Sequence, residues 1–275
     1  MTHSRPGIHD LLETHGLAAR RDLGQNFVAD PNTVRRIAAL AAVGPGDHVV
    51  EIGAGLGSLT LALADTGATV TAVEVDTGIV PVLRDVVADR EEVTVVEADA
   101  MDLDWDELLP PEVPGGWIMV ANLPYNVATP LICDVLDDVP QVRRMLVMVQ
   151  KEVAQRFAAQ PGSGAYGAVS VKVAYWARAR LVTTVPATVF VPRPNVESAL
   201  VEIVRRDPPD TARAEMFDLV RRAFGQRRKM LRRSLHDAVP PEAFARAEVA
   251  PTARPEELPV EAWCRLADEV ARGHG

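Results

Sequence analysis

Apolar and polar residues along positions 31–150 form two patterns that follow each other in regular order. Residues 31–43 have the spacing of an amphipathic helix, with Asp30 as the N-terminal cap and Pro31 in the first turn. Further segments with helical spacing cover residues 58–67, 78–89 and 128–138. Short apolar segments that predict buried strands cover residues 48–53, 69–76, 93–99, 116–124 and 143–150. Strands separated by helices imply right-handed crossovers, so we predict a doubly wound α/β fold with a parallel sheet covered on both faces.

The pattern changes after residue 150. Residues 167–177 and 199–206 read as strands, and we predict that they close one edge of the sheet. Residues 207–212, DPPDTA, break the pattern as a linker, and the remainder has helical spacing. We therefore predict an α/β domain over residues 1–206 and a small all-α domain over residues 207–275.

The composition is that of a folded globular chain, with 48% hydrophobic and 24% charged residues. No apolar run approaches the roughly 20 residues that a membrane-spanning helix needs, and the N-terminus lacks the basic and apolar segments of a secretion signal. We expect a cytoplasmic, monomeric protein with no membrane partner. Cys133 and Cys264 lie far apart and without the spacing of metal ligands, so we expect reduced cysteines and no metal site.

The net charge of −9 argues against a nucleic-acid partner, but the distribution of charge reverses that interpretation. Residues 37–142 hold two basic and nineteen acidic side chains, whereas residues 143–193 hold eight basic side chains and one acid. Residues 221–233, RRAFGQRRKMLRR, hold seven positive charges and no acid. Such asymmetry is typical of a protein that presents one face to a polyanion. Solvated arginine-rich helix faces would give the same counts, so charge alone does not decide.

The first strand of the predicted sheet ends in a glycine-rich turn, VVEIGAGLGSLT, with Gly53, Gly55 and Gly57. Open α/β sheets bind ligands at this edge, and glycines let the backbone turn sharply and a ligand approach closely. Glu74 ends the next strand, from which a carboxylate can accept both hydrogen bonds of a ribose diol. Asp99 ends the third strand, where a carboxylate could accept from an adenine amino group. Together these positions indicate a nucleoside cofactor.

Two cofactors fit this turn. A nicotinamide dinucleotide would normally be bound by G-x-G-x-x-G, but Ser58 stands where the last glycine would fall. The form E-x-G-x-G-x-G resembles instead the cofactor loop of S-adenosylmethionine-dependent methyltransferases. The end of the fourth strand, Asn122-Leu123-Pro124-Tyr125, resembles the N/D-P-P-Y box of methyltransferases that act on exocyclic amines of adenine. We therefore expect S-adenosylmethionine as the cofactor.

The chemistry of this box follows from the adenine amine, whose lone pair is delocalised into the ring. Acceptors that hold its two hydrogens favour a more tetrahedral nitrogen, and the Asn122 oxygen and the Leu123 carbonyl, fixed by Pro124, fit these roles. Tyr125 can stack on an extruded base and tolerate a nearby sulfonium. No general base is needed, because the amine becomes acidic only after accepting the methyl group, and alignment supplies most of the rate. Taken alone, the same four residues could equally be a strand-ending turn.

Nine segments in order resemble the ribosomal RNA adenine dimethyltransferases that modify small-subunit rRNA. They are LGQNFVADPNTV, VEIGAGLGSLT, VEVD, EADAMD, NLPYNVATPLI, QKEVAQRF, GAYGAVSV, VFVPRPNVESALV and FGQRRKMLRRSL, which span residues 20 to 240. The resemblance implies a Rossmann-like catalytic domain and a small C-terminal helical domain that binds RNA. It also implies transfer of four methyl groups to N6 of two adjacent adenosines in a hairpin near the 3′ end of 16S rRNA.

The resemblance also implies the site residues. Residues 1–30 are expected to cover the cofactor and substrate, with Asn26 and Val28 at the methionine end of the cofactor. Val28 replaces the Leu of many relatives, so a contact there would be made by the backbone. The implied cofactor-binding residues are Asn26, Val28, Gly53, Glu74, Asp99 and Asn122, with Gln25, Gly55 and Ala100 nearby.

On the target side, Phe190 in VFVPRP matches the aromatic that in this family packs on the target base opposite Tyr125. A core phenylalanine at the start of a strand is the alternative. We expect RNA contacts on the basic segments, because arginines on phosphates add sequence-independent affinity. The candidates are Arg193, Arg221, Arg222, Arg227, Arg228, Lys229, Arg232 and Arg233.

Competing functions remain open at this point. Relatives that dimethylate one adenosine of large-subunit rRNA and confer macrolide resistance share the box, but they usually have Ile at the position of Leu123 and a more basic composition. The chain could instead act mainly as an assembly checkpoint that binds immature small subunits, with methylation secondary. A DNA adenine methyltransferase is less favoured, because no target-recognition domain is recognisable.

Overall fold

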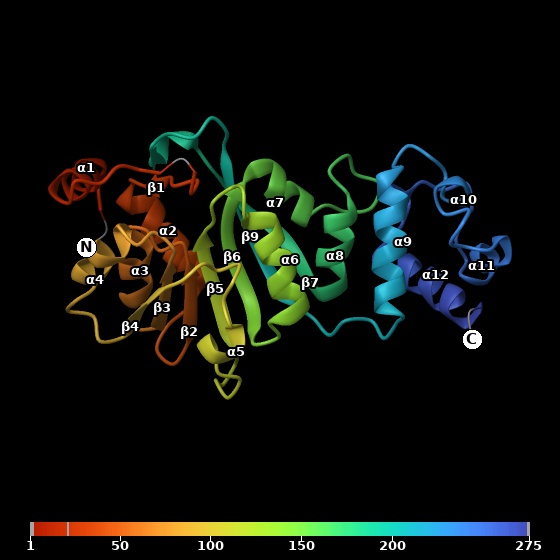
Figure 1. Cartoon of the computed structure of the whole chain (residues 1–275), viewed down its shortest axis with the longest axis horizontal. Coiled ribbons are helices and arrows are strands. Elements are labelled where there is room, and N and C mark those ends of the chain that lie inside the picture. Colours follow the sequence, from red (N-terminus) through yellow and green to blue (C-terminus); the bar gives the residue numbers. More distant parts are fainter. Residues whose placement is uncertain (1–2, 21, 274–275) are drawn as a thin grey trace. The chain divides into compact units, whose positions relative to one another are not determined.

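The computed structural model describes residues 3–20 and 22–273, which form two compact units (Figure 1). Unit 1 contains the described residues up to Ala154 together with Leu181–Val204, and unit 2 contains Gln155–Arg180 together with the described residues from Arg205 onward. The chain therefore crosses between the units three times. The last crossing lies next to the boundary predicted after residue 206, whereas the place of residues 155–180 in unit 2 is not indicated by the sequence pattern.

The central sheet, within the described residues, has seven strands in the order β4-β3-β2-β5-β6-β9-β7. These are β2 (His48–Ile52), β3 (Thr69–Glu74), β4 (Val93–Glu97), β5 (Trp117–Asn122), β6 (Val142–Gln150), β7 (Ala177–Val185) and β9 (Ser198–Arg205). Strands β2 to β6 pair in parallel, and β9 pairs antiparallel to β6. Because the order reverses between β2 and β5, the ligand-binding edge lies beyond the carboxyl ends of these two strands.

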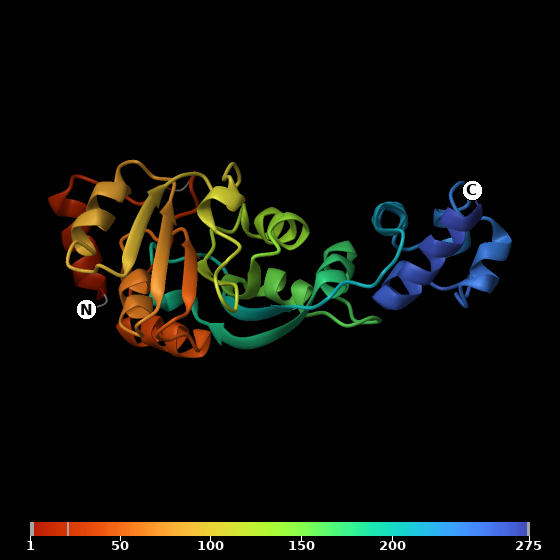
Figure 2. The same ribbon diagram turned by 90° about the horizontal axis from the view of Figure 1, so that it is seen from below.

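Helices lie on both faces of this sheet, which confirms the predicted doubly wound fold (Figure 2). Those of unit 1 include α1 (Arg5–Thr14), α2 (Pro31–Ala41), α3 (Ser58–Ala64), α4 (Ile79–Val86), α5 (Trp105–Leu108) and α6 (Ala128–Asp138). Helix α2 begins as predicted, because the Asp30 carboxylate accepts from the backbone N–H of Asn32 and Thr33. Helices α2 and α3 bury their apolar faces against Val49 and Val70 of the sheet.

A second, two-stranded sheet holds the N-terminal part of unit 1 in place. Its strands, β1 (Phe27–Val28) and β8 (Phe190–Val191), pair antiparallel. Helix α1 packs against β1 through Ile8 and Leu12. The Arg5 guanidinium donates to the carbonyls of Thr188 (2.7 Å) and Phe190 (3.3 Å) on the partner segment. The residues that precede α2 are thus tied to a segment more than 150 residues away.

Unit 2 is mainly helical. Its elements are α8 (Ala168–Trp176), α9 (Arg213–Gly225), α10 (Leu231–Ser234), α11 (Pro241–Arg246) and α12 (Val260–Gly273), and α7 (Lys151–Phe157) leads into it from unit 1. The strand predicted over residues 167–177 is wrong, because this segment forms α8, and β7 after it supplies the edge strand. Its alternating valines satisfy strand spacing, but Val171 and Tyr175 are buried in the helical core of unit 2, and such packing overrides local propensity.

Trp263 lies at the centre of that core and is fully buried. Neighbouring core side chains come from α8, α9, α11 and α12, so residues from both parts of unit 2 share one apolar cluster. No helix in the described part of the chain combines the length and the hydropathy that crossing a membrane requires.

Replacing Trp263 by Ala is expected to lower the free energy of unfolding of unit 2 by about 3–5 kcal/mol, because the cavity cannot collapse fully. Trp263→Phe should cost less, since the indole N–H has no hydrogen-bond partner among the described residues. Scanning calorimetry should show the transition of unit 2 at a lower temperature in the Ala variant and that of unit 1 unchanged. Equal shifts of all transitions would contradict the assignment of Trp263 to the core of unit 2 alone.

Candidate functional site

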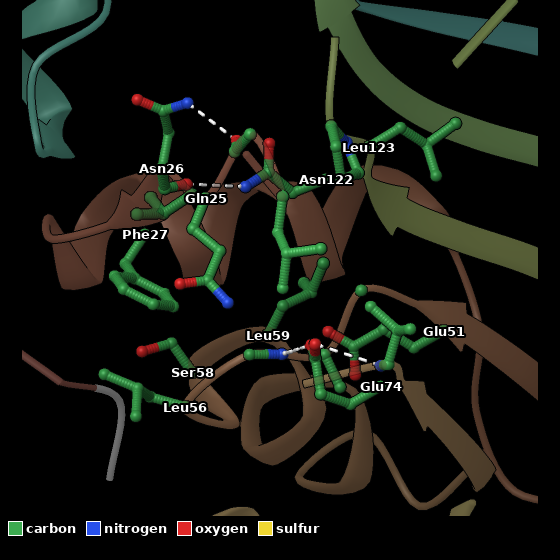
Figure 3. Close-up of a pocket in the computed structure, with 18 of the residues that line it drawn as sticks. Gln25, Asn26, Phe27, Glu51, Leu56, Ser58, Leu59, Glu74, Asn122 and Leu123 are labelled. Atoms are coloured by element: carbon green, nitrogen blue, oxygen red, sulfur yellow. Dashed lines mark hydrogen bonds between the residues drawn. The ribbon is translucent and has the colours of Figure 1, made fainter. Parts of the chain in front are cut away.

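A pocket in unit 1 opens beyond the carboxyl ends of β2, β3 and β5 (Figure 3). Four parts of the chain line it: the segment before α2, the end of β2 with the glycine turn and the start of α3, the end of β3, and the end of β5. The lining residues are 23–28, Glu51, 53–56, Ser58, Leu59, Glu74, Val75 and 122–125. The pocket thus brings together most of the residues that the sequence predicts for cofactor and target, including Gln25, Gly53, Glu74 and Asn122.

The glycine turn has the conformation that its sequence predicts. Gly53, Gly55 and Gly57 have φ angles of 73°, 56° and 80°, which side chains rarely tolerate. A Cβ atom on Gly55 would also lie 3.1 Å from the ring of Phe27. Glycine is therefore needed both for the backbone conformation and for space, and Phe27, which is not among the predicted site residues, packs over the turn.

Glu74 ends β3 with its side chain buried in the wall of the pocket. Its carboxylate accepts from the backbone N–H of Gly55 (2.7 Å), Val75 (3.1 Å) and Asp76 (3.0 Å). Burial raises the pKa of Glu74, and these three hydrogen bonds oppose the rise. A carboxylate offers about four acceptor sites. The arrangement therefore leaves acceptor capacity for a ligand hydroxyl.

Glu51 is a second buried carboxyl in the same pocket; it is the first residue of the E-x-G-x-G-x-G form but is not among the predicted site residues. It lies two residues before Gly53, and an acid inside an apolar strand is the signal that could have found it. Its carboxyl accepts from the Thr60 hydroxyl at 2.6 Å. Burial raises the pKa of Glu51 to about 8; the Thr60 hydrogen bond lowers it and Glu74 raises it further. Figure 3 shows Glu51 and Glu74 on the opposite side of the pocket from Phe27.

Asn122, at the end of β5, has its side chain oriented by the segment before α2. Its Nδ2 donates to the Asn26 carbonyl at 3.0 Å, and no hydrogen bond to its Oδ1 is found among the described residues (Figure 3). The backbone of Leu123 is anchored through its N–H, which donates to the Met148 carbonyl at 3.0 Å. Among the described residues no donor reaches the Leu123 carbonyl. Two acceptors for an amine are therefore available side by side.

Tyr125 lies at the edge of the pocket and is half-buried. Its hydroxyl shares a hydrogen bond of 2.8 Å with Ser198 Oγ, and the Ser198 side chain is completely buried. Burial raises the pKa of Tyr125, and the bond to Ser198 opposes the rise. Ser198 falls in the quoted VESALV segment but is not predicted as a site residue. It fixes one end of the Tyr125 ring.

Gln25 holds the segment before α2 over the pocket. Its Nε2 donates to Asp76 at 2.8 Å, and its Oε1 accepts from the Arg20 N–H at 2.8 Å. Asn26 folds back, with its own amide donating to the Gly24 carbonyl at 2.9 Å. These side-chain bonds tie the segment to the loop after β3, and its predicted covering of the cofactor stays a prediction.

Three predicted residues do not line the pocket. Asp99 is exposed and accepts a hydrogen bond from the Met101 N–H. Asp99 and Ala100 come just after β4, where the Ala98 N–H donates to the Glu74 carbonyl at 3.1 Å. Phe190 is completely buried and opposes Val28 in the small sheet. The predicted contacts of Asp99 and Ala100 with the cofactor and of Phe190 with the target base stay predictions.

The predicted RNA-contacting residues fall into two groups. Arg193 is exposed in unit 1, and the other candidates lie in unit 2. Three of these have acidic neighbours. Arg221 and Arg222 form ion pairs with Asp218, and the Arg227 guanidinium lies 3.8 Å from the Glu256 carboxylate. The others are exposed and form no ion pair within the described ranges; they are Arg228, Lys229, Arg232 and Arg233.

The fold and this site together define a Rossmann-like methyltransferase, with a glycine turn and buried acids on one side and an Asn-Leu-Pro-Tyr strand end on the other. The model of the family described as ribosomal RNA adenine dimethylase matches residues 16–272. The chain therefore belongs to the ribosomal RNA adenine dimethylase family, which confirms the resemblance seen in the sequence.

Curated relatives match over nearly the whole chain. A protein of Bifidobacterium longum subsp. infantis named ribosomal RNA small subunit methyltransferase A is 43% identical over 96% of this chain and 92% of its own. A protein of the same name from Streptomyces coelicolor is 44% identical over 95% and 94%.

Solved structures share the architecture. The 23S rRNA methyltransferase ErmE aligns with a TM-score of 0.69 at 27% identity, over 89% of this chain and 99% of its own. A dimethyladenosine transferase from Plasmodium falciparum aligns with a TM-score of 0.73 at 22% identity, over 86% and 94%. At that identity the second likeness supports the fold alone.

Replacing Ser198 by Ala is expected to slow methyl transfer about fivefold, because Tyr125 loses the bond that fixes its ring and one hydrogen bond is worth about 1 kcal/mol. Tyr125→Phe should slow it similarly, and the double variant should be no slower than either. Single-turnover rates would measure this. Rate losses that multiply in the double variant would show that the two side chains act independently.

A second prediction concerns pH. Since the folded pKa of Glu51 is raised to about 8, the folded protein retains a proton that the unfolded chain releases at a pKa near 4.5. This group therefore makes unit 1 less stable as pH rises from about 5 to 8, by up to about 1.4 kcal/mol per pH unit. Thermal midpoints of wild type and Glu51→Gln should diverge across this range, with the variant relatively more stable at pH 8. A constant difference would contradict the prediction.

Proposed function

We propose that this protein transfers methyl groups from S-adenosylmethionine to N6 of two adjacent adenosines in the 3′-terminal hairpin of 16S rRNA in the small ribosomal subunit. The observation that carries the proposal is the Asn122 side chain: its amide donates to the Asn26 carbonyl, and no described residue donates to its oxygen, which lies near the Leu123 carbonyl. The names and the 43–44% identity of the curated relatives support the small subunit as substrate.

The pocket fits the proposed cofactor. A nucleoside needs a partner for its ribose, which the Glu74 carboxylate offers, and close approach of the backbone, which the glycine turn allows. Asn26 and Val28 would cover its amino-acid end, and Asp99 would accept from its adenine. When bound, S-adenosylmethionine supplies an electrophilic methyl group on a sulfonium.

The side chains of the β5 end act on the target amine. Asn122 Oδ1 and the Leu123 carbonyl accept its two hydrogens and favour a tetrahedral nitrogen with an available lone pair. Tyr125 offers a face on which an extruded base stacks, and its ring is fixed by Ser198. Phe190 would contact the same base only after leaving the core, so its predicted role requires a rearrangement of β8.

The charges of the two units support an RNA partner. Unit 1 carries 11 Lys and Arg against 26 Asp and Glu, whereas unit 2 carries 18 against 12. An acidic unit repels phosphates, so unit 2 and its exposed residues at positions 228–233 are the proposed grip on rRNA. We expect the protein to act as a monomer in the cytoplasm, where small subunits are assembled.

Two alternatives are tested together with the main proposal. The likeness to ErmE at 27% identity keeps large-subunit rRNA as a possible substrate, although the small-subunit relatives share more of the sequence. The second alternative is an assembly checkpoint with methylation secondary, because that role would use the same binding surface as the enzyme.

The test incubates the protein with labelled S-adenosylmethionine and, in parallel, unmethylated small subunits, large subunits and DNA, followed by digestion to nucleosides. N6,N6-dimethyladenosine is expected from small subunits alone. Asn122→Ala should lower its formation by about 100-fold, because the amine loses its orienting acceptor, while small-subunit binding is kept. Asn32→Ala, at an exposed asparagine of α2, is the matched control and should keep full activity. Dimethyladenosine from large subunits only would overturn the proposed substrate.

The same variant, expressed in cells that lack the native protein, distinguishes the enzymatic role from the checkpoint alternative. If Asn122→Ala restored small-subunit assembly fully, binding rather than methylation would be the main role. Defective assembly with the variant, despite normal binding, would support the enzymatic role.

A further inference from the structure

A second pocket lies within unit 2 and is not used by the proposed site. We call it the unit 2 pocket; its lining residues fall within positions 157–161, 166–179 and 259–261, together with Arg206. It is thus formed by the loop before α8, by α8 with the start of β7, and by the start of α12. Its volume is about 360 Å³, and sites for small molecules usually measure about 300–1,000 Å³. The unit 2 pocket can therefore hold more than a simple ion.

The wall of this pocket is largely apolar. Phe157, Val173 and Val260 line it and are almost completely buried. Tyr166 is held in the same wall, because its hydroxyl donates to the Leu258 carbonyl at 2.9 Å. Exposed prolines form part of the rim. An apolar wall behind an open rim suits the ring of a nucleobase, whose faces are apolar.

Two arginines of the lining keep hydrogen-bond donors for an anion. Arg178 is exposed, and its guanidinium has no ion pair or hydrogen bond within the part of the chain that the structure describes. Arg206 donates through Nη2 to the Ala174 carbonyl, and its buried Nε–H has no acceptor among the described residues. A buried donor without an acceptor is costly, so a ligand oxygen that accepts from it would stabilise the site.

One acid of the lining opposes these arginines. The side chain of Glu261 is 59% exposed, and its carboxylate lies 3.9 Å from Arg206 Nη2. Such a long and exposed ion pair is weak and is screened by salt, so a phosphate can compete for the guanidinium. Residues 155–180, which supply most of the lining, include no acidic side chain. The pocket thus combines an apolar wall with two guanidinium groups against one carboxylate.

The loop at the rim joins this pocket to the basic run at 221–233. The Arg227 guanidinium donates to the Gly164 carbonyl at 3.1 Å, and the Gly162 N–H donates to the Glu256 carbonyl at 2.7 Å. Figure 1 shows the loop before α8 reaching toward the end of α9 that leads to α10. The rim of the pocket and the proposed grip on rRNA therefore share one loop, within one compact unit.

We propose that the unit 2 pocket binds one unpaired nucleotide of the rRNA, with the base against the apolar wall and the phosphate on Arg178 and Arg206. This inference rests on the proposed function, since it assumes an RNA substrate. A nucleotide fits better than an acidic peptide, because only a nucleotide supplies both a base for the wall and a phosphate for the arginines. RNA is favoured over a free nucleotide as the source, because the rim shares its loop with the proposed grip.

The test measures the affinity for unmethylated small subunits at several salt concentrations, with S-adenosylhomocysteine saturating the pocket of unit 1. Arg178→Gln should lower the magnitude of the slope of log affinity against log salt by about 0.7, because one phosphate contact on a single strand is lost. Ala179→Leu adds side-chain volume to the lining and should lower the affinity about tenfold. The double variant should bind no more weakly than Ala179→Leu alone, since both changes act on the same nucleotide.

The matched control is Arg272→Gln, which removes an exposed arginine of α12. This residue lies twelve positions after Val260, which corresponds to about 18 Å along the helix, so slope and affinity should stay those of the wild type. A fully paired RNA duplex should bind Ala179→Leu as it binds the wild type, because it offers no unpaired nucleotide. All variants must bind S-adenosylhomocysteine and melt as the wild type does, which shows that they fold.

The outcomes separate this inference from the proposed function. Wild-type slope and affinity in Arg178→Gln and Ala179→Leu would overturn the pocket as an RNA site but not the methyltransferase proposal. Equal weakening of duplex binding by Ala179→Leu would overturn the unpaired nucleotide as the ligand. A loss seen with small subunits but not with naked 16S rRNA would indicate a ribosomal protein as the partner instead.

A free nucleotide is tested with the four nucleoside monophosphates, again with S-adenosylhomocysteine present. Tight binding that is lost in Ala179→Leu, without any change in the affinity for RNA, would overturn rRNA as the source of the ligand. A wild type that binds small subunits but methylates none of them would overturn the proposed function alone.

Discussion

The site depends on one hydrogen bond, from the Asn122 amide to the Asn26 carbonyl. It joins the end of β5 to the segment before α2 and orients the asparagine, because the amide nitrogen is occupied and the oxygen must face the other way. The same segment places Phe27 over the glycine turn and pairs through Val28 with β8. One short stretch of backbone therefore sets the geometry of both the cofactor side and the target side.

Burial of acids is the second constraint, since an uncompensated charge in an apolar wall is costly. The two carboxyls of the pocket meet it in different ways: three backbone N–H groups stabilise the charge of Glu74, and a raised pKa keeps Glu51 protonated. Burial raises the pKa of both carboxyls, and that of Glu51 reaches about 8. On the larger scale, acidic side chains are concentrated in unit 1, and a positive excess is left for unit 2.

The sequence predicts the parallel sheet and its ligand-binding edge well, because buried strands and glycine turns have strong local signals. It fails at residues 167–177, where alternating valines favour a strand and only the packing partners, distant in sequence, make a helix. The position of Asn122 follows from its strand end, but its orientation depends on a carbonyl 96 residues away, for which no local signal exists. Ser198 is missed for the same reason. Phe190 shows a further limit. The motif match predicts that its side chain contacts the target base, but it does not indicate in which conformation this buried side chain becomes exposed.

The three crossings of the chain between units have a consequence for synthesis on the ribosome. Residues 155–180 emerge and can form α8 well before residues 205–275, whose helices cover its apolar side, have been made. In a nascent chain the buried face of α8, with Val171 and Tyr175, would stay exposed to solvent while β9 is synthesised. During that interval the nascent chain exposes apolar surface that favours aggregation and chaperone binding, although the finished protein buries it.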